Sequence, residues 1–154
     1  MANETDQAWM QEALNEAARA FEAGEVPVGA VVVLNGRVVG RGGNRKESGR
    51  DPTAHAEMIA IRQAAAELGR WRLSGCTIYA TLEPCPMCVG AMLSARLDRL
   101  VFGCRDPKAG AVASLFELAG DERLNHRIEV REGVAADQAA ELLRSFFRLR
   151  RGAR

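Results

Sequence analysis

Three potential metal ligands in two distant segments constrain the fold of this chain more than any other feature of its sequence. His55 lies in the stretch His55-Ala56-Glu57, and two cysteines lie in the stretch Pro84-Cys85-Pro86-Met87-Cys88. One imidazole and two thiolates supply three of the four ligands that tetrahedral zinc prefers, and an open fourth position for water is typical of catalytic zinc. The pattern therefore predicts that the fold brings His55, Cys85 and Cys88 together around a catalytic zinc ion.

Glu57 is the candidate catalytic residue beside these ligands. It is not needed to complete the ligand set, so its carboxylate is free to move protons on and off a water molecule. The cysteine pair alone would also suit a redox pair or half of a structural zinc site. A structural site with four cysteines needs a second close pair, and the remaining Cys76 and Cys104 are far apart in the sequence. The combination with His55 and Glu57 favours the catalytic interpretation.

The composition indicates one folded domain. The 154 residues are 47% hydrophobic and 27% charged, which is sufficient for a proper core. We expect a single domain over residues 1–154, with a zinc core at about 26–105 and a basic C-terminal helix at about 137–151. No run of some eighteen apolar residues occurs, so we expect no membrane partner. The four cysteines fit a reducing compartment, which predicts a cytoplasmic protein.

Apolar periodicity predicts an α/β fold. Helices are expected over 6–23, 54–68, 85–94 and 137–150, with a short helical piece at 114–118, and strands over 28–34, 37–40, 76–81, 99–103 and 128–131. Asn35-Gly36 predicts a hairpin, Thr53 a helix cap, and residues 41–52 a loop. The order predicts a mixed five-stranded sheet covered by helices on both faces, with His55 and Cys85 at helix starts beyond strand ends.

The end of the chain is strongly basic. Residues 141–154 contain one glutamate and five arginines, which are Arg144, Arg148, Arg150, Arg151 and Arg154. Such a cluster is a candidate phosphate-contacting surface. The alternative is a solvated helix end whose cations interact well with the helix dipole.

Motifs along nearly the whole chain, about residues 7–151, resemble those of bacterial tRNA-specific adenosine deaminases. The H-x-E…P-C-x-x-C pattern is shared by zinc-dependent nucleobase deaminases in general. The more specific stretches are Glu25–Val31, Asp51–Glu57, Thr81–Cys88, Val101–Gly103, Asn125–Arg127 and Phe146–Arg151. The resemblance implies a three-layer, cytidine-deaminase-like fold, a homodimer and one zinc ion per subunit. It also implies conversion of adenosine to inosine at the wobble position of a tRNA anticodon, typically of an arginine tRNA.

The same resemblance assigns residues around the base. Asn44 would hydrogen-bond the target nucleotide, and Val26 would form part of the apolar pocket wall. The backbone near Glu83 and Pro84 would meet the reacting edge of the base. These roles belong to the family's motifs at the matching positions of this chain.

Further residues would contact the anticodon stem-loop. By resemblance, Asp106 would contact a neighbouring ribose, while Phe147, Arg150 and Arg151 would face the flanking loop nucleotides. Adjacent helix residues point about 100° apart, so we expect at least one of Phe146 and Phe147 to pack in the core instead. Aromatic stacking and phosphate contacts are typical of the recognition of single-stranded RNA loops.

Two other functions share part of this pattern. A free-base or nucleotide deaminase acting on cytosine, guanine or a cytidine nucleotide would have every zinc residue but no need of the arginine tail. A non-catalytic zinc module that binds RNA would lose nothing when Glu57 is replaced by glutamine. His126, the second histidine, would be a surplus ligand that displaces water, so we expect it to be structural.

Overall fold

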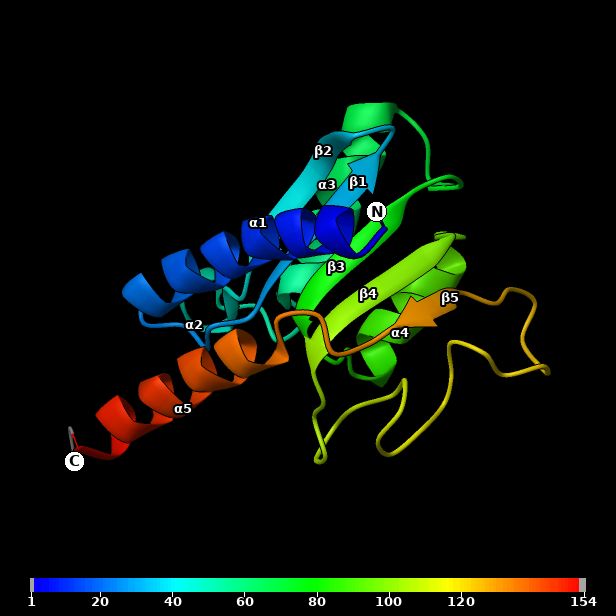
Figure 1. Ribbon diagram of the computed structural model, residues 1–154. Helices are drawn as coiled ribbons and strands as arrows, with labels where there is room; N and C mark the ends of the chain where they lie inside the picture. The colour runs from blue at the N-terminus through cyan, green and yellow to red at the C-terminus, as the bar shows by residue number, and fades with distance from the viewer. Residues whose placement is uncertain (1, 153–154) are drawn as a thin grey trace.

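The fold is built on one five-stranded mixed sheet with the strand order β2-β1-β3-β4-β5 (Figure 1). The computed structural model describes residues 2–152 of the chain, with side chains described from Thr5 onward. The strands are β1 Gly29–Leu34, β2 Arg37–Gly43, β3 Thr77–Leu82, β4 Arg99–Cys104 and β5 Glu129–Arg131. β1 is antiparallel to both β2 and β3, whereas β3, β4 and β5 run parallel. The expected mixed five-stranded sheet is confirmed.

Helices cover both faces of this sheet and complete the three layers. They are α1 Ala2–Glu22, α2 Lys46–Gly49, α3 Ala56–Leu68, α4 Pro86–Ser94 and α5 Ala136–Gly152. Successive strand side chains point to opposite faces. Ile78 and Phe102 pack in one buried cluster with α3 and α4, whereas Tyr79 and Val101 pack in a second cluster with α1 and α5. The cytidine-deaminase-like architecture expected from the sequence is the observed one.

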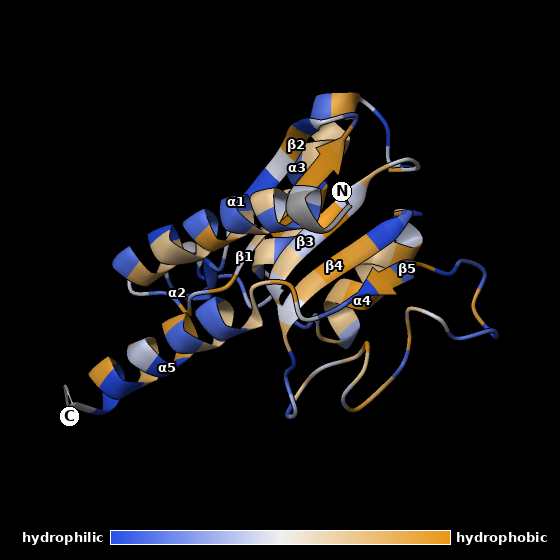
Figure 2. Ribbon diagram, in the orientation of Figure 1, coloured by the Kyte–Doolittle hydropathy of each residue, from blue (hydrophilic) through white to orange (hydrophobic). Residues whose placement is uncertain are grey.

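Hydrophobic residues concentrate along the central strands, whereas α1 and α5 alternate between hydrophobic and hydrophilic residues (Figure 2). This alternation is that of amphipathic helices, which bury one stripe against a sheet. None of the helices within residues 2–152 combines the length and the apolar character needed to cross a bilayer.

The hairpin between β1 and β2 forms where the sequence predicts it. Asn35 and Gly36 have φ angles of 51° and 73°. Two central residues with positive φ make the turn whose twist matches that of the flanking strands. The hairpin was predictable because its signal is local to the two turn residues.

Three local expectations are wrong. The segment 41–52 contains the end of β2 and the short helix α2, so it is not entirely loop. Thr53 does not cap α3, because the helix begins at Ala56 and the Thr53 hydroxyl donates a hydrogen bond to Asp51 Oδ1. Residues 114–118 form turns and irregular chain in place of a helical piece.

Candidate active site

The two halves of the site are the N-terminal ends of α3 and α4. His55 is the N-cap residue of α3 and Cys85 is that of α4, both with extended backbone. Neither side chain makes the usual capping hydrogen bond to its own helix. The two side chains instead contact each other between the helix ends. The sequence predicts a site at this place, where helices begin after the carboxyl ends of strands.

His55, Cys85 and Cys88 form a compact group of three potential ligands. The Nδ1 atom of His55 lies 3.6 Å from Cys85 Sγ and 3.4 Å from Cys88 Sγ. All three ligand atoms lie within 4.8 Å of one another. These separations match the edges of a tetrahedron with zinc–ligand bonds of about 2.0 to 2.3 Å. Two sulfurs and one imidazole nitrogen form a donor set suited to zinc.

The two thiols differ sharply in acidity before any metal binds. A hydrogen bond from the Cys88 thiol, together with the contact from His55, outweighs burial and lowers the pKa of Cys85 to about 4. The same hydrogen bond, together with burial and the charge of Glu57, raises the pKa of Cys88 far above its ordinary value. The hydrogen bond to Cys85 also raises the pKa of His55. The pair of sulfurs thus shares one proton, which a cation binding there would release.

Glu57 lies beside these ligands with one oxygen unpartnered. Its side chain is only 3% exposed, and its buried Oε1 atom has no hydrogen-bond partner among the described residues. Burial raises the pKa of Glu57 to about 7. A buried acceptor without a partner costs free energy, which is expected only where a ligand or reactant supplies the partner. The arrangement fits a carboxylate that exchanges protons with a water molecule held at the three ligands.

Asn44 links the ligand helix to a cavity. Its Oδ1 atom accepts a hydrogen bond of 2.9 Å from the backbone N–H of Ala56. Asn44 therefore provides a partner for a free N–H group at the start of α3, a role expected for Thr53. The cavity measures about 170 Å³, and its lining includes Val26, Asn44, Phe147 and Arg150. Four residues predicted to contact the substrate thus come together from three distant parts of the chain.

The basic end of α5 divides into paired and unpaired arginines. Arg144 and Arg148 form ion pairs with Glu141, whereas Arg150 and Arg151 have no carboxylate partner among residues 5–152, whose side chains the structure describes. Arg150 instead lies 5.3 Å from the ring centre of Phe146. Arg154, the fifth arginine of the predicted cluster, lies outside the described residues.

One of the two adjacent phenylalanines is buried, as expected, and the other is exposed. Phe146 is 5% exposed and meets Phe21 edge-on, with ring centres 5.7 Å apart. Phe147 is 44% exposed and lines a second hollow on α5 together with Arg151. An exposed aromatic ring beside unpaired arginines is suited to stacking on nucleobases.

The Glu83 side chain has a role that the sequence did not indicate. Its carboxylate is buried and accepts hydrogen bonds from the segment 106–114. The carbonyl of Pro84 accepts a hydrogen bond of 2.8 Å from Ala111 N–H. Asp106 lies at the start of this segment, and its Oδ1 atom accepts hydrogen bonds from the backbone N–H groups of Lys108 and Ala109.

Glu25 is a second buried glutamate that the sequence did not single out. Its two carboxylate oxygens accept hydrogen bonds of 3.1 and 2.7 Å from the N–H groups of Glu47 and Ser48 in α2. The short helix is therefore held by a tertiary contact. No pattern within residues 46–49 could have revealed that contact.

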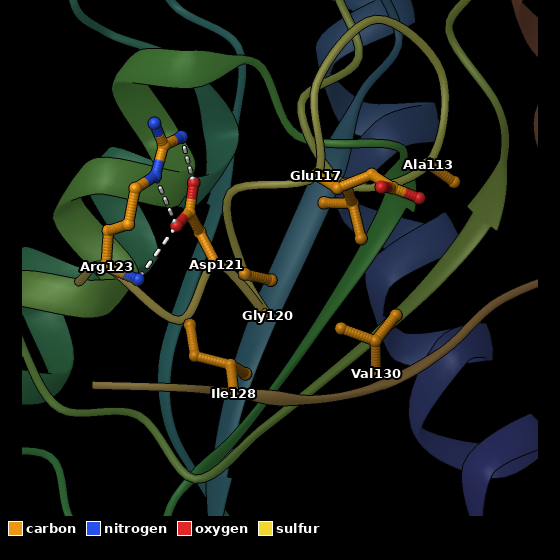
Figure 3. A pocket seen from close by; sticks show the side chains of 9 residues that line it. Ala113, Glu117, Gly120, Asp121, Arg123, Ile128 and Val130 are labelled. Carbon is orange, nitrogen blue, oxygen red and sulfur yellow. Dashed lines mark hydrogen bonds and ion pairs between the residues drawn. The ribbon is translucent and has the colours of Figure 1, made fainter. Parts of the chain in front are cut away.

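A hollow of about 690 Å³ is lined by residues of the segment 112–130 (Figure 3). Ala113, Glu117, Ile128 and Val130 are part of its lining, and it shares no residue with the His55, Cys85 and Cys88 group. His126 is also separate from that group, because its Nε2 atom lies 2.7 Å from the Leu97 carbonyl oxygen. The position of His126 agrees with the structural role expected for it.

Comparison with known proteins agrees with this geometry. Residues 4–151 match the family described as MafB19-like deaminase. The tRNA-specific adenosine deaminase of Bacillus subtilis (strain 168) is 48% identical over 143 residues, which cover 93% of this chain and 89% of that protein. A solved structure from work on A-to-I editing by tRNA:A34 deaminases has a TM-score of 0.85 at 47% identity, covering 88% of this chain and 99% of that one. The chain belongs to the tRNA-specific adenosine deaminase family.

The chain is also similar in fold to guanine deaminases. A guanine deaminase from Nitrosomonas europaea has a TM-score of 0.76 at 29% identity, covering 91% of this chain and 83% of that one. The layered sheet is thus common to both kinds of deaminase. A shared fold therefore does not determine which substrate either kind of deaminase takes.

Proposed function

We propose that this enzyme converts adenosine to inosine at the wobble position of a tRNA anticodon, that of an arginine tRNA, in a zinc-dependent reaction. The observation that carries the proposal is the unpartnered Oε1 of Glu57 beside the group formed by His55, Cys85 and Cys88. We further propose a cytoplasmic homodimer of one domain per chain, with one zinc ion per subunit. Four free cysteines support the reducing compartment.

His55, Cys85 and Cys88 would hold the zinc ion. When bound, zinc supplies Lewis-acid activation of a water molecule at neutral pH. Glu57 accepts one proton from the attacking water and delivers it to the ring nitrogen, and then transfers the second proton of that water from the new C–OH group to the departing amine. Adenosine and water become inosine and ammonia, and the carboxylate returns to its starting state. A pKa of about 7, raised by burial, suits a group that must both accept and donate in one turnover.

The surface around the centre supports RNA as the substrate. The cavity that includes Val26, Asn44 and Phe147 in its lining opens beside the unpaired Arg150. In the proposed role, Asn44 and Val26 position the base, with the backbone at Glu83 and Pro84 along its reacting edge. Asp106, Phe147, Arg150 and Arg151 contact the flanking anticodon-loop nucleotides. A loop base is already largely unstacked, so drawing it into the site costs little.

A free-base deaminase is the second candidate function. The likeness to the guanine deaminase of Nitrosomonas europaea favours it, because that enzyme shares the fold over most of this chain. Such an enzyme has no use for an exposed phenylalanine and unpaired arginines at the end of α5. Family membership as a deaminase leaves no support for a non-catalytic zinc module.

A substrate comparison tests the proposal. Zinc-loaded protein is given an arginine-tRNA anticodon stem-loop with adenosine at the wobble position, or free guanine, or free cytosine. We expect inosine in the stem-loop and no ammonia from either free base. Ammonia from a free base without inosine in RNA would move the enzyme to the second candidate function.

A further inference from the structure

The carboxylate of Glu83 is enclosed by five hydrogen-bond donors from one segment of the chain. Its Oε1 atom accepts from Asp106 N–H at 2.9 Å and from the Ser114 hydroxyl. Its Oε2 atom accepts from the N–H groups of Val112, Ala113 and Ser114 at 3.1, 2.8 and 2.9 Å. Successive backbone N–H groups that converge on one point form a nest for an anion. Here the anion is a side chain of the same protein.

The loop fits closely around this carboxylate. A Cβ atom at Gly110 would lie 2.3 Å from the Glu83 carboxyl carbon and 2.4 Å from each of its oxygens. Glycine is therefore required at this position by the approach of the backbone to Glu83. The segment is also tied to the ligand helix, because Ala111 N–H donates to the carbonyl of Pro84, the residue before Cys85.

Glu83 is unsuited to proton transfer in spite of its place near the site. Its side chain is only 2% exposed, and both of its oxygens already accept hydrogen bonds, two at Oε1 and three at Oε2. A carboxylate whose acceptors are all occupied in this way orders its neighbours and is not free for chemistry.

The ordered segment carries Asp106 at its first position. Asp106 gives its backbone N–H to Glu83, while its side-chain Oδ1 accepts from Lys108 and Ala109 N–H. Its side chain is only partly buried. The backbone of Asp106 is thus fixed from the inside by Glu83, while its carboxylate is presented at the surface of the loop.

We propose that Glu83 is a positioning residue that sets the 106–114 loop and, through it, the place of Asp106 against the RNA substrate. The part that concerns RNA rests on the proposed function. The part that concerns the loop stands on the five hydrogen bonds and on the contact with Gly110. Loss of the nest would leave several backbone N–H groups without partners and would loosen the loop.

Glu83→Gln is the central variant of the test. The amide keeps the shape of the side chain, but its NH₂ group would face N–H donors where a carboxylate oxygen now accepts. Ser114→Ala removes one of the five donors and should disturb the loop in the same way but less strongly. Glu67→Gln, on an exposed face of α3, is the matched control for the substitution.

Hydrogen exchange and kinetics are measured on the zinc-loaded proteins. In Glu83→Gln we expect the amides of Asp106, Val112, Ala113 and Ser114 to exchange at least about tenfold faster than in the wild type. We expect KM for the anticodon stem-loop to rise by about tenfold with a smaller change in kcat, at unchanged zinc content. Ser114→Ala should change both quantities in the same direction by less, and Glu67→Gln should change neither.

A double-mutant cycle with Gly110→Ala shows whether Glu83 acts through this contact. The added methyl group would collide with the Glu83 carboxylate, and the shorter side chain of Glu83→Asp would relieve the collision. We expect the double variant Gly110→Ala/Glu83→Asp to have a KM for RNA below the value obtained by multiplying the effects of the single changes. Simple additivity would contradict a role through the contact between Glu83 and Gly110.

Unchanged exchange of the four amides in Glu83→Gln would overturn the proposal, as would a loss of activity that follows loss of zinc. If Glu83→Gln does not fold, Ser114→Ala and the Gly110 cycle carry the same test. The proposed function fails separately. A wild-type enzyme inactive on RNA would disprove that function, while the exchange of the four amides would still decide the role of Glu83 in the loop.

Discussion

Glu57 and Glu83 are two buried glutamates in opposite surroundings. Glu57 follows the candidate ligand His55 by two residues, and Glu83 precedes the candidate ligand Cys85 by two. Their side chains are 3% and 2% exposed. Yet Oε1 of Glu57 has no hydrogen-bond partner in the part of the chain that the structure describes, whereas Glu83 accepts five hydrogen bonds. Burial raises the pKa of Glu57 to about 7, while hydrogen bonding overcomes burial and lowers the pKa of Glu83 to about 2.

The comparison separates a carboxylate suited to reaction from one suited to support. A group that must exchange protons keeps an oxygen free and a pKa near the working pH. A group that must hold a loop stays ionised and uses all its acceptors. Both lie two residues from a candidate ligand, so position in the sequence alone does not assign the role. The partners of each carboxylate assign it.

The largest expected effect concerns the ligands beside Glu57. Cys88→Ser should lower zinc content to near zero and deamination by at least about 10³-fold, because serine is a poor substitute for a thiolate ligand. Cys76→Ser is the matched control, since Cys76 is also buried but lies outside the ligand group. Metal analysis and a single-turnover assay check the two variants. Full activity of Cys88→Ser with one zinc ion bound would disprove the ligand assignment.

The same substitution at the two glutamates should change stability in opposite ways. Glu83→Gln breaks a satisfied nest, so we expect the free energy of unfolding to fall by about 3 kcal/mol. Glu57→Gln removes a buried charge whose Oε1 atom has no partner among the described residues, so stability should be unchanged or higher by about 1 kcal/mol. Denaturant unfolding at equal zinc content measures both. Equal losses of the free energy of unfolding in the two variants would contradict the proposed difference between Glu57 and Glu83.

A third buried carboxylate extends the comparison to pH. Asp6 is 2% exposed and accepts hydrogen bonds from Tyr79, Arg99 and Arg131, so it joins α1 to β3, β4 and β5. The hydrogen bond from Arg99 is the largest cause that lowers the pKa of Asp6 from 3.8 to about 2, against the opposing effect of burial.

Because the folded-state pKa of Asp6 is the lower one, its contribution to stability is complete above the unfolded value. That contribution disappears as the pH falls from about 4 to about 2. The free energy of unfolding of the wild type should therefore exceed that of Asp6→Asn at pH 5. This difference should be smaller at pH 2 by on the order of 2 kcal/mol. Unfolding of both proteins across this range measures the difference. A difference that does not change with pH would show that Asp6 is not held ionised.

The smallest effect is expected at the end of α5. Arg150→Ala/Arg151→Ala should weaken binding of the anticodon stem-loop by about tenfold and reduce the slope of affinity against salt by about 1 to 2, because two phosphate contacts are lost. Arg37→Ala, an exposed arginine on β2 paired with Glu67, is the control. Binding measured over a range of salt concentrations decides the matter. An unchanged slope would mean that the two arginines form an ordinary solvated helix end.

Local patterns account for what the sequence could predict. A continuous apolar run rich in β-branched residues predicted the first strand, Asn35-Gly36 predicted the hairpin, and the pattern of His55, Cys85 and Cys88 indicated the group that the structure brings together. Each of these signals lies within a few residues, or in a ligand set whose chemistry is distinctive. The types of residue at the site could therefore be predicted from the sequence.

The errors arise where a side chain from one segment of the chain holds the backbone of another. Helix α2 is held by Glu25, and Glu83 holds the N–H groups of Ala113 and Ser114 where the irregular stretch 114–118 begins. The cap of α3 comes from Asn44, a residue of the preceding loop, and not from the nearby Thr53. Such contacts join positions that no short-range periodicity connects, so only the tertiary structure shows them.

The most direct test of the account is a single-turnover assay of the wild type and Glu57→Gln on the wobble-adenosine stem-loop, both with one zinc ion bound. The account predicts inosine at the wobble position with an equal amount of ammonia in the wild type. It predicts a rate lower by about 10³-fold or more in the variant, because the proton acceptor is lost while the ligands remain. Equal rates for the two proteins would contradict the role of Glu57, and no inosine in the wild type would contradict the proposed reaction.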